Sequence, residues 1–557
     1  MMKTSGGIRL LGVVASIAML GTALASGGAQ AASAPARHAP NQPQYGGTLT
    51  MDLSSPWVHL DPALAYDTTS YEAVLQMYDQ LLTYQGTTNH VIGDLAARWS
   101  ISNGGKTYSF WLRKAKFWNG DPVTANSFIT EFERVLKNPA SGGQGFIDPL
   151  IVGSDAFQKG KAGTISGMKS LDGGKELQIN LTQSSPTFQY VLCMPFYSAV
   201  DPAYIKAHPD TVKNDYMEQH PMGTGAFELT SVKPGQQWVF TKNRHYFKKG
   251  LPYLNKLVFN LDSSAESVLL HFEQGQTDFI GYNQAGNGIP SQDYLPIMRS
   301  KWGKYTYTAT QVATLYIGLN SKVGPTASLQ VRRALEYAVN KNELLRILDG
   351  RGVIANQPLP TSMPSAYVKN LPADAQYSYN PAKARALLKA AGYKGQPLTI
   401  YTDNSNPDDL RIAEAVQQMF KSVGVNVKPV NATAWSVFLP NNETGKQGVF
   451  TLAWLEDFPD PSDFLNTLFN SSQQPVNNSS MFTSPAVDKL LNQAQNMPNS
   501  PARDAIYRRL EGMIMAQAPW IPYVYPTYTA ALQPWVHGYY LNPNLVDPFQ
   551  KMWVSSH

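Results

Sequence analysis

Residues 95–136 constrain the fold most, because they predict a strand, a turn and a helix in direct succession. Between residues 107 and 113 polar and apolar side chains alternate, which is the period of a strand with one buried face. Asn-Gly-Asp-Pro at residues 119–122 then turns the chain. Thr124 is the predicted N-cap of the helix that follows. One apolar stripe of this helix is expected to pack on a core, because its apolar side chains recur at helical spacing: Phe128, Ile129, Phe132, Val135 and Leu136.

The region from residue 380 to residue 460 predicts alternating helices and strands. Asn380 and Pro381 begin a helix that Gly392 ends. Strands are predicted at residues 398–402, 425–430 and 449–455, and helices at residues 407–423 and 435–439. This β-α-β-α-β order implies a parallel or mixed sheet covered by helices.

Two polar loops follow predicted strands of this region. Residues 403–411 come after the strand that ends at Thr402, and residues 456–463 come after the strand that ends at Leu455. In open α/β sheets a ligand sits outside the carboxyl ends of the strands. Both loops are therefore expected to border a ligand cleft.

The length of 557 residues exceeds that of one compact core, so two or three lobes are expected. The formal net charge is only +5 and no basic run is present, so no nucleic-acid partner is expected.

A single cysteine, Cys193, excludes an internal disulfide. It lies in an apolar, strand-like run at residues 190–194 and is predicted to be a buried structural thiol.

Residues 1–31 predict a secretory signal peptide. An apolar run at residues 8–24 is accompanied by Lys3 and Arg9, and Ala29-Gln30-Ala31 forms an A-x-A-type cleavage site. Residues 32–44 predict a flexible start. No other segment is apolar enough to cross a bilayer, and no cysteine follows the signal. The mature chain is therefore expected to be periplasmic or secreted, and not a lipoprotein.

The sequence carries no nucleophile elbow, phosphate-binding loop, H-E-x-x-H or C-x-x-C motif. Its nine histidines are scattered, with no pair at helical spacing, which disfavours a local zinc or nickel site. No enzymatic activity, cofactor or metal is therefore expected.

The acidic cluster of Glu456, Asp457, Asp460 and Asp463 could form a paired-carboxylate glycosidase site. We interpret Asp460 and Asp463 instead as turn and helix-cap residues.

An ordered series of sequence blocks resembles the solute-binding proteins of peptide and nickel ABC importers, which form family 5 and include the oligopeptide- and dipeptide-binding proteins. A lone Gly-Thr-Gly would mean little, but the series runs through most of the mature chain. Its blocks are YGGTL at residues 45–49, LDPA at 60–63, LAARW at 95–99, GKTYSFWLRKAKFWNGDPVTANSF at 105–128, PMGTGAF at 221–227, NRHYF at 243–247, VRRAL at 331–335, YAVN at 337–340, residues 384–393, and WLEDFPDP at 454–461.

The resemblance implies an α/β fold of the periplasmic binding protein-like II type, in its large three-lobed form (cluster C type). A hinge and an interlobe ligand cleft belong to this fold. Lobe I is expected to comprise residues 45–88, 219–310 and 522–557, lobe II residues 89–218, and lobe III residues 311–521.

Asp457 lies just past a predicted strand end, where a carboxylate would face the cleft, and the resemblance implies that it meets the α-ammonium group of a peptide ligand. Ala453 and Leu455, which flank Trp454, are predicted to offer backbone groups to an extended ligand as an added strand. The resemblance also places Thr68 and Thr69 against the ligand from the first lobe.

Two further residues are candidates for ligand contact. Arg411 lies near the start of a predicted helix, where the helix dipole and a guanidinium both favour a ligand carboxylate. The alternative for Arg411 is a solvated helix residue or a partner of Glu414. Trp435, like Trp454, could stack on a peptide side chain or on a sugar.

By resemblance, the protein is expected to be a monomeric extracytoplasmic component of an ABC importer. It would capture short peptides and deliver them to an inner-membrane ABC permease. Two alternatives stay open from the residues alone. One is the same fold with another solute, such as an oligosaccharide or a nickel chelate, and the other is a secreted hydrolase that uses the acidic loop.

Overall fold

The computed structural model describes residues 42–54, 57–209, 216–261, 264–281, 288–404, 407–542, 544 and 548–556. Within these ranges the side chains of residues 68, 69, 265, 291, 407 and 436 are not described. The predicted signal peptide and most of the predicted flexible start lie outside the described residues. All described residues belong to one unit that spans Ala39–His557.

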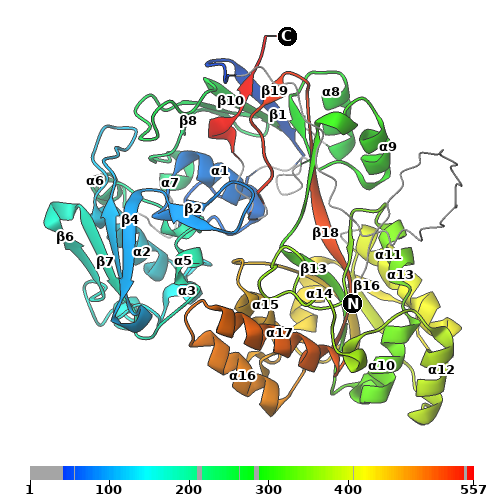
Figure 1. Cartoon of the computed structure of the whole chain (residues 1–557). Helices are drawn as coiled ribbons and strands as arrows, with labels where there is room; N and C mark the ends of the chain where they lie inside the picture. The colour runs from blue at the N-terminus through cyan, green and yellow to red at the C-terminus, as the bar shows by residue number, and fades with distance from the viewer. Residues whose placement is uncertain are drawn as a thin grey trace, which may run out of the picture. The chain divides into compact units, whose positions relative to one another are not determined.

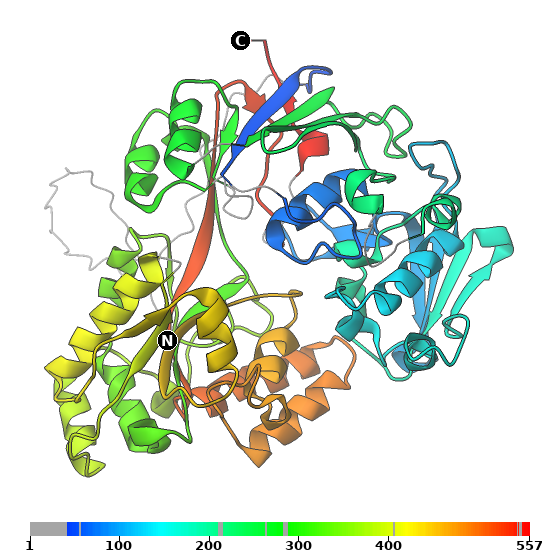
Figure 2. The same ribbon diagram turned by 180° about the vertical axis from the view of Figure 1, so that it is seen from behind.

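The largest sheet in the described residues has 12 strands and is mixed. Its longest strand, β18, pairs with β13 and β14 along its first part and with β12 and β11 along its second part. β18 therefore connects the two halves of the sheet, as Figures 1 and 2 show in red. The strands are β1 (Thr48–Leu53), β8 (Phe227–Lys233), β9 (Gln237–Lys242), β10 (Lys256–Leu261), β11 (Phe279–Ile280), β12 (Thr306–Thr310), β13 (Ala313–Leu319), β14 (Gly352–Ile354), β15 (Ile400–Asp403), β16 (Asn431–Thr433), β17 (Val449–Leu455) and β18 (Trp520–Leu532).

The strand, turn and helix predicted for residues 95–136 are confirmed. The strand is β5 (Thr107–Leu112), in which Tyr108 and Phe110 are buried, and the helix is α2 (Ala125–Lys137). The backbone N–H of Thr124 donates to Ser127 Oγ at 3.2 Å, which stabilises the start of α2. β5 lies in an antiparallel sheet with β4 (Ala96–Ser102), β7 (Glu176–Asn180) and β6 (Met168–Leu171).

The predicted alternation after residue 380 is mostly confirmed. β15 pairs in parallel with both β16 and β17, whereas β17 pairs antiparallel with β13, so this part of the sheet is mixed. The strand predicted at residues 425–430 is wrong. That segment makes only an isolated bridge between Val427 and Leu398, and the short strand β16 begins after it, at Asn431. Val425 and Val427 are nevertheless buried, which explains the strand-like alternation in the sequence.

Helices cover both faces of the sheet around β13 and β17. Because neighbouring side chains of a strand point to opposite faces, Leu319 and Val449 pack under one layer of helices, and Tyr316, Phe450 and Trp520 pack under the other. The first layer comprises α10 (Leu329–Ala338), α11 (Lys341–Ile347), α12 (Pro381–Ala390) and α13 (Pro407–Ser422). The second comprises α15 (Pro461–Phe469), α16 (Pro485–Gln495) and α17 (Pro501–Met515). Figure 1 shows the two layers in yellow-green and in orange.

The remaining elements are short. The strands are β2 (Leu82–Tyr84), β3 (Val91–Gly93), β19 (Val536–His537) and β20 (Trp553–Val554). The helices are α1 (Thr68–Met77), α3 (Gln144–Ile147), α4 (Ser154–Gln158), α5 (Phe188–Val191), α6 (Pro202–Ala207), α7 (Tyr216–Gln219), α8 (Ala265–Glu273), α9 (Tyr294–Arg299) and α14 (Trp435–Asn442). Among the described helices, none combines the length and the apolar character that a bilayer span requires.

Cys193 is buried, as predicted, but it does not lie in a strand-like segment. Residues 188–191 form the helix α5, and the N–H of Cys193 donates to the Tyr190 carbonyl at 2.9 Å in a turn that follows it. Residues 191–194 are all buried, which explains why the run is apolar. A short apolar run of this kind does not distinguish strand from helix by periodicity.

Candidate functional site

The carboxyl ends of β15, β16 and β17 lie at one edge of the sheet, because the three strands run in the same direction. β15 leads to α13, β16 leads to α14, and β17 leads through residues 456–460 to α15. The two predicted cleft loops therefore leave the same edge. This is where open α/β sheets place their ligands.

The last residues of β17 have an open side. Glu456 N–H donates to the Val312 carbonyl at 3.1 Å, in register with the pair of Leu455 and Ala313. Since backbone groups alternate along an antiparallel strand, Ala453 and Leu455 direct their N–H and C=O groups away from β13. On that side β15 pairs with β17 only at residues 449 and 450. No strand of the described residues pairs with Ala453 or Leu455 there, so their backbone groups are available to an extended ligand.

Two aspartates fix the loop after β17. Asp460 caps α15, since its carboxylate accepts a hydrogen bond from Ser462 N–H at 2.9 Å, and Arg503 donates to both of its oxygens at 2.8 Å. The interpretation of Asp460 as a helix cap is thus confirmed. Asp463, in the first turn of α15, accepts hydrogen bonds from Trp454 Nε1 at 3.0 Å and from Asp457 N–H at 3.2 Å. These bonds hold Asp457 immediately beyond the open edge of β17.

Asp457 meets the N-terminal part of the chain. The Tyr66 hydroxyl donates to Asp457 Oδ1 at 2.9 Å, across 391 residues of sequence. Both side chains line a cavity of about 200 Å³. The other lining residues are Tyr71, Tyr84, Met194, Leu455, Glu456, Phe458, Pro459 and Asn544. The cavity therefore combines acidic groups from the loop after β17 with tyrosines from residues 66–84.

The electrostatics of this loop disfavour its own negative charge. Burial raises the pKa of the Asp457 carboxyl, and the hydrogen bond from Tyr66 lowers it in part. Burial also raises the pKa of Glu456 and of Asp463 well above their ordinary values, and the neighbouring carboxylates raise both further. A positively charged ligand group in the cavity would relieve this repulsion.

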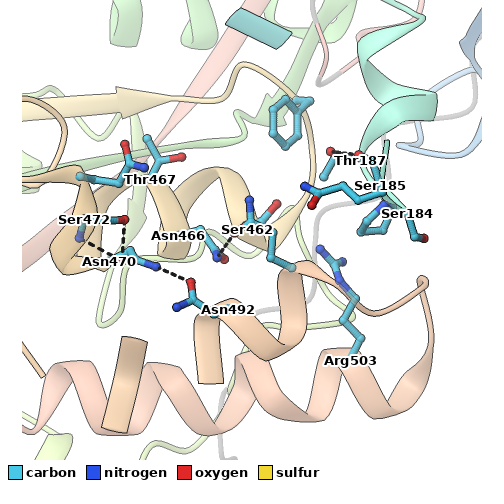
Figure 3. Close-up of a pocket in the computed structure, with 15 residues that line it drawn as sticks. Ser184, Ser185, Thr187, Ser462, Asn466, Thr467, Asn470, Ser472, Asn492 and Arg503 are labelled. Carbon is cyan, nitrogen blue, oxygen red and sulfur yellow. Dashed lines mark hydrogen bonds between the residues drawn. The ribbon is translucent and has the colours of Figure 1, made fainter. Parts of the chain in front are cut away.

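A second cavity, of about 180 Å³, adjoins the first and shares Phe458 with it. It lies between residues 183–187 and the helices α15 and α16, and its lining is rich in amide and hydroxyl groups. Asn470 is held there between Ser472 and Asn492 by hydrogen bonds of 2.8 and 3.0 Å (Figure 3). Arg503 lines this cavity but already binds Asp460 with both Nη atoms. The second cavity is therefore suited to bind neutral ligand groups that form hydrogen bonds.

Two other predicted contact residues lie outside the Asp457 cavity. Arg411 is half exposed in the first turns of α13, where its Nη2 atom donates to Asp408, three residues earlier, and not to Glu414. Arg351 binds the second oxygen of Asp408 at 2.5 Å. Trp435 begins α14 at the same sheet edge and is 46 % exposed. Thr68 and Thr69 begin α1, but their side chains lie outside the described residues.

Sequence reasoning missed the three tyrosines of the cavity and the role of Arg503. Tyr66 and Tyr71 lie on either side of the threonines that the resemblance indicated, so the segment was found but not the side chains. Arg503 carries no local signal for its contact with Asp460, 43 residues away. In the described residues, no group of three or more His, Cys, Asp or Glu side chains is arranged to hold a metal ion.

The fold and the site together define a ligand-binding protein whose site lies at the carboxyl edge of a mixed sheet. Residues 90–475 match the family model described as bacterial extracellular solute-binding proteins, family 5 (middle region). The match covers more than half of the chain. The protein therefore belongs to family 5 of the solute-binding proteins, the extracytoplasmic components of ABC importers.

Characterised relatives resemble the protein along most of its length. Heme-binding protein A of Haemophilus influenzae is 28 % identical, over 88 % of this chain and 89 % of the relative. The periplasmic murein peptide-binding protein MppA of Escherichia coli is 27 % identical, over 89 % of this chain and 91 % of the relative. The solved structure of the Escherichia coli murein tripeptide binding protein MppA superimposes with a TM-score of 0.72 at 26 % identity, and covers 92 % of this chain and 99 % of that structure.

Proposed function

We propose that the protein captures short peptides at the edge of β17 and delivers them to an inner-membrane ABC permease. One observation carries the proposal. Asp457 lines a cavity directly beyond β17, where the backbone groups of Ala453 and Leu455 point away from β13 and pair with no described strand on that side. A peptide with a free N-terminus offers the two matching groups, an ammonium and an extended backbone.

Asp457 supplies the electrostatic part of this recognition. An ammonium that leaves water for a closed cavity loses its hydration, and a carboxylate in good geometry offsets that cost. The same contact stabilises the ionised form of Asp457, which burial disfavours in the free protein. The hydroxyl of Tyr66 holds the carboxylate in place at 2.9 Å.

The strand edge supplies recognition that does not depend on side chains. Backbone groups of Ala453 and Leu455 would pair with the ligand as an added strand, which allows one site to accept many sequences. The polar crevice beside Phe458 would receive a neutral ligand side chain. Trp454 would stack on a ligand side chain with its ring face. Its indole N–H donates to Asp463 at 3.0 Å and holds the loop in position.

The other predicted contacts are proposed with specific conditions. Arg411 would bind the ligand carboxylate only after it exchanges Asp408 for the ligand, and Arg351 would then neutralise Asp408 alone. Trp435 would stack on a ligand side chain at the sheet edge, where its exposed ring begins α14. Thr68 and Thr69 would face the ligand from the start of α1.

The lobe boundaries given above and the cellular handling of the chain are also proposed. Separate hydrophobic cores support the lobes: one lies mainly within residues 63–199, one joins residues 49–78 with segments after residue 200 and near the C-terminus, and two lie within residues 312–524. We further propose that the signal peptide is cleaved after Ala31, that the mature protein carries no lipid, and that it is a monomer.

Native mass spectrometry of the purified mature protein tests the proposed function. The protein is incubated with an equimolar mixture of short peptides and glycans, exchanged into volatile buffer, and the ligand is then released and sequenced. We expect one intact peptide bound per chain. Recovery of a glycan, or of cleaved peptides, would contradict the proposal, and the second result would favour a hydrolase.

A further inference from the structure

The cavity at Asp457 is lined by more carboxyl groups than one α-ammonium can pair with. Glu456 and Asp457 both line it, and Asp463 lies directly behind them. Three tyrosines, Tyr66, Tyr71 and Tyr84, form much of the remaining wall. In the described part of the chain, the lining includes no lysine, arginine or histidine.

Glu456 is the acid that the α-ammonium contact leaves without a partner. Its Oε2 atom is inaccessible to solvent and makes no hydrogen bond within the described residues. By contrast, Asp457 accepts a hydrogen bond from Tyr66, and Asp463 accepts bonds from Trp454 and from the backbone of Asp457. A buried polar atom without a partner costs free energy, so a ligand group that binds Glu456 gains what the free protein lacks.

The groups that face Glu456 are acidic or phenolic. Asp457 and Asp463 raise the pKa of its carboxyl in addition to burial. Tyr71 and Tyr84 line the same cavity, and Glu456 adds to the rise in their pKa values that burial chiefly causes. The cation next to this loop, Arg503, binds Asp460 with both Nη atoms, and its Nε donates to the Ala494 carbonyl at 3.0 Å.

We propose that the cavity selects peptides whose first residue carries a basic side chain, lysine or arginine. This inference rests on the proposed function, in which Asp457 binds the α-ammonium. The side-chain cation of the same residue would then bind Glu456, and the tyrosine rings would face both charges. Aromatic faces attract cations, most strongly where water is excluded. A cation beside Glu456 favours its carboxylate form and so opposes the rise in pKa that burial causes.

Calorimetry with two tripeptides tests this selection. Lys-Ala-Ala and norleucine-Ala-Ala have nearly the same length and apolar surface and differ by the side-chain charge. We expect the parent protein to bind the lysine peptide at least about tenfold more tightly, since a desolvated charge pair is worth more than 1.4 kcal/mol. Glu456→Gln, which keeps the shape, should reduce this preference to about threefold or less. The exposed Glu414→Gln on α13 is the matched control and should leave the preference unchanged.

A second measurement uses the parent protein alone and so does not depend on whether Glu456→Gln folds correctly. Binding is measured at pH 7 in buffers of different ionisation enthalpy. The lysine peptide should release more protons on binding than the norleucine peptide, because its side-chain cation lowers the pKa of Glu456. Equal affinities and equal proton counts for the two peptides, or a lysine preference that survives in Glu456→Gln, would overturn the inference and leave peptide binding intact. Failure of both peptides to bind would instead contradict the proposed function.

Discussion

Arg503 on α17 binds the carboxylate of Asp460 with two hydrogen bonds of 2.8 Å, and both side chains are almost fully buried. The pair joins α17 to the N-terminus of α15, directly after the loop that carries Asp457. A planar guanidinium matches a carboxylate in this two-point geometry. The position of Asp457 therefore depends on a contact that lies behind the cavity.

Replacing Arg503 with methionine should destabilise the protein strongly. Removing one partner of a buried ion pair leaves an uncompensated charge and typically costs about 3–5 kcal/mol. The exposed Arg509→Met on the same helix is the control and should change stability by less than about 0.5 kcal/mol. Urea unfolding of the three proteins measures the difference. A free energy of unfolding for Arg503→Met within 1 kcal/mol of the parent, on the scale of an exposed pair, would mean that the pair contributes little.

The glycine turn at residues 221–227 is required for steric reasons. A Cβ atom on Gly225 would lie 2.3 Å from the Gln76 carbonyl oxygen and 2.4 Å from the Met77 carbonyl carbon, and both are backbone atoms. Gly225→Ala should therefore lower stability by about 1–3 kcal/mol. Gly163→Ala is the control, because nothing lies within 4 Å of its Cβ position. Equal melting temperatures for the two variants would show that the backbone at residues 76–77 yields without cost.

Glu511 should make stability depend on pH. Burial raises the pKa of its carboxyl from 4.5 to about 8, although the Leu359 N–H donates to it at 3.1 Å. The folded protein thus keeps this proton between about pH 4.5 and pH 8, whereas the unfolded chain releases it. The contribution of Glu511 to the free energy of unfolding is therefore fully present below pH 4.5. It is lost as the pH rises to about 8, by at most roughly 1.4 kcal/mol per pH unit.

Glu511→Gln should reduce this dependence, because the amide does not ionise in this pH range and its oxygen can still accept the Leu359 N–H. Urea unfolding at pH 5 and pH 8 is the measurement. The free energy of unfolding should fall less between the two pH values in the variant than in the parent. Identical falls in both proteins would assign the pH dependence to other groups.

Tyr66→Phe should shift the pH range in which ligand binds. The Tyr66 hydroxyl lowers the pKa of Asp457, so its loss raises that pKa further above the ordinary value. An ammonium ligand binds the ionised carboxylate. As the pH is lowered, peptide affinity should therefore begin to fall at a higher pH in the variant than in the parent. Peptide affinity measured from pH 5 to pH 8 tests this shift. Superimposable pH profiles would show that Tyr66 does not act on Asp457.

Elements with strong periodicity and clear caps could be predicted from the sequence. α2 follows its N-cap Thr124 and has a continuous apolar stripe, and β17 was predicted with its observed bounds. The prediction of a strand at residues 425–430 was wrong. Val425 and Val427 alternate with exposed residues because they are buried, but the segment forms no continuous hydrogen-bonded ladder with another strand. Alternation reports which side chains are buried, and it does not report which backbone groups pair.

The site could be predicted only from its strand side. Asp457 and the backbone of Ala453 and Leu455 follow from their place at a strand end. The tyrosines of the cavity come from residues nearly 400 positions away, and no local pattern records such a contact. The pairing of Arg411 was visible in principle, because Asp408 precedes it by three residues and such pairs share a helix face.

The most direct test of the account is calorimetry on the parent protein and Asp457→Asn, each with a free tripeptide and with the same peptide N-acetylated. Truncating one partner of a desolvated charge pair typically costs about 2–5 kcal/mol, and 1.4 kcal/mol is a factor of ten. The variant should therefore bind the free peptide at least roughly tenfold more weakly than the parent does. The acetylated peptide, which lacks the ammonium, should lose much less. If Asp457→Asn binds the free peptide as tightly as the parent, Asp457 does not hold the ligand's ammonium, and the proposed peptide site is contradicted.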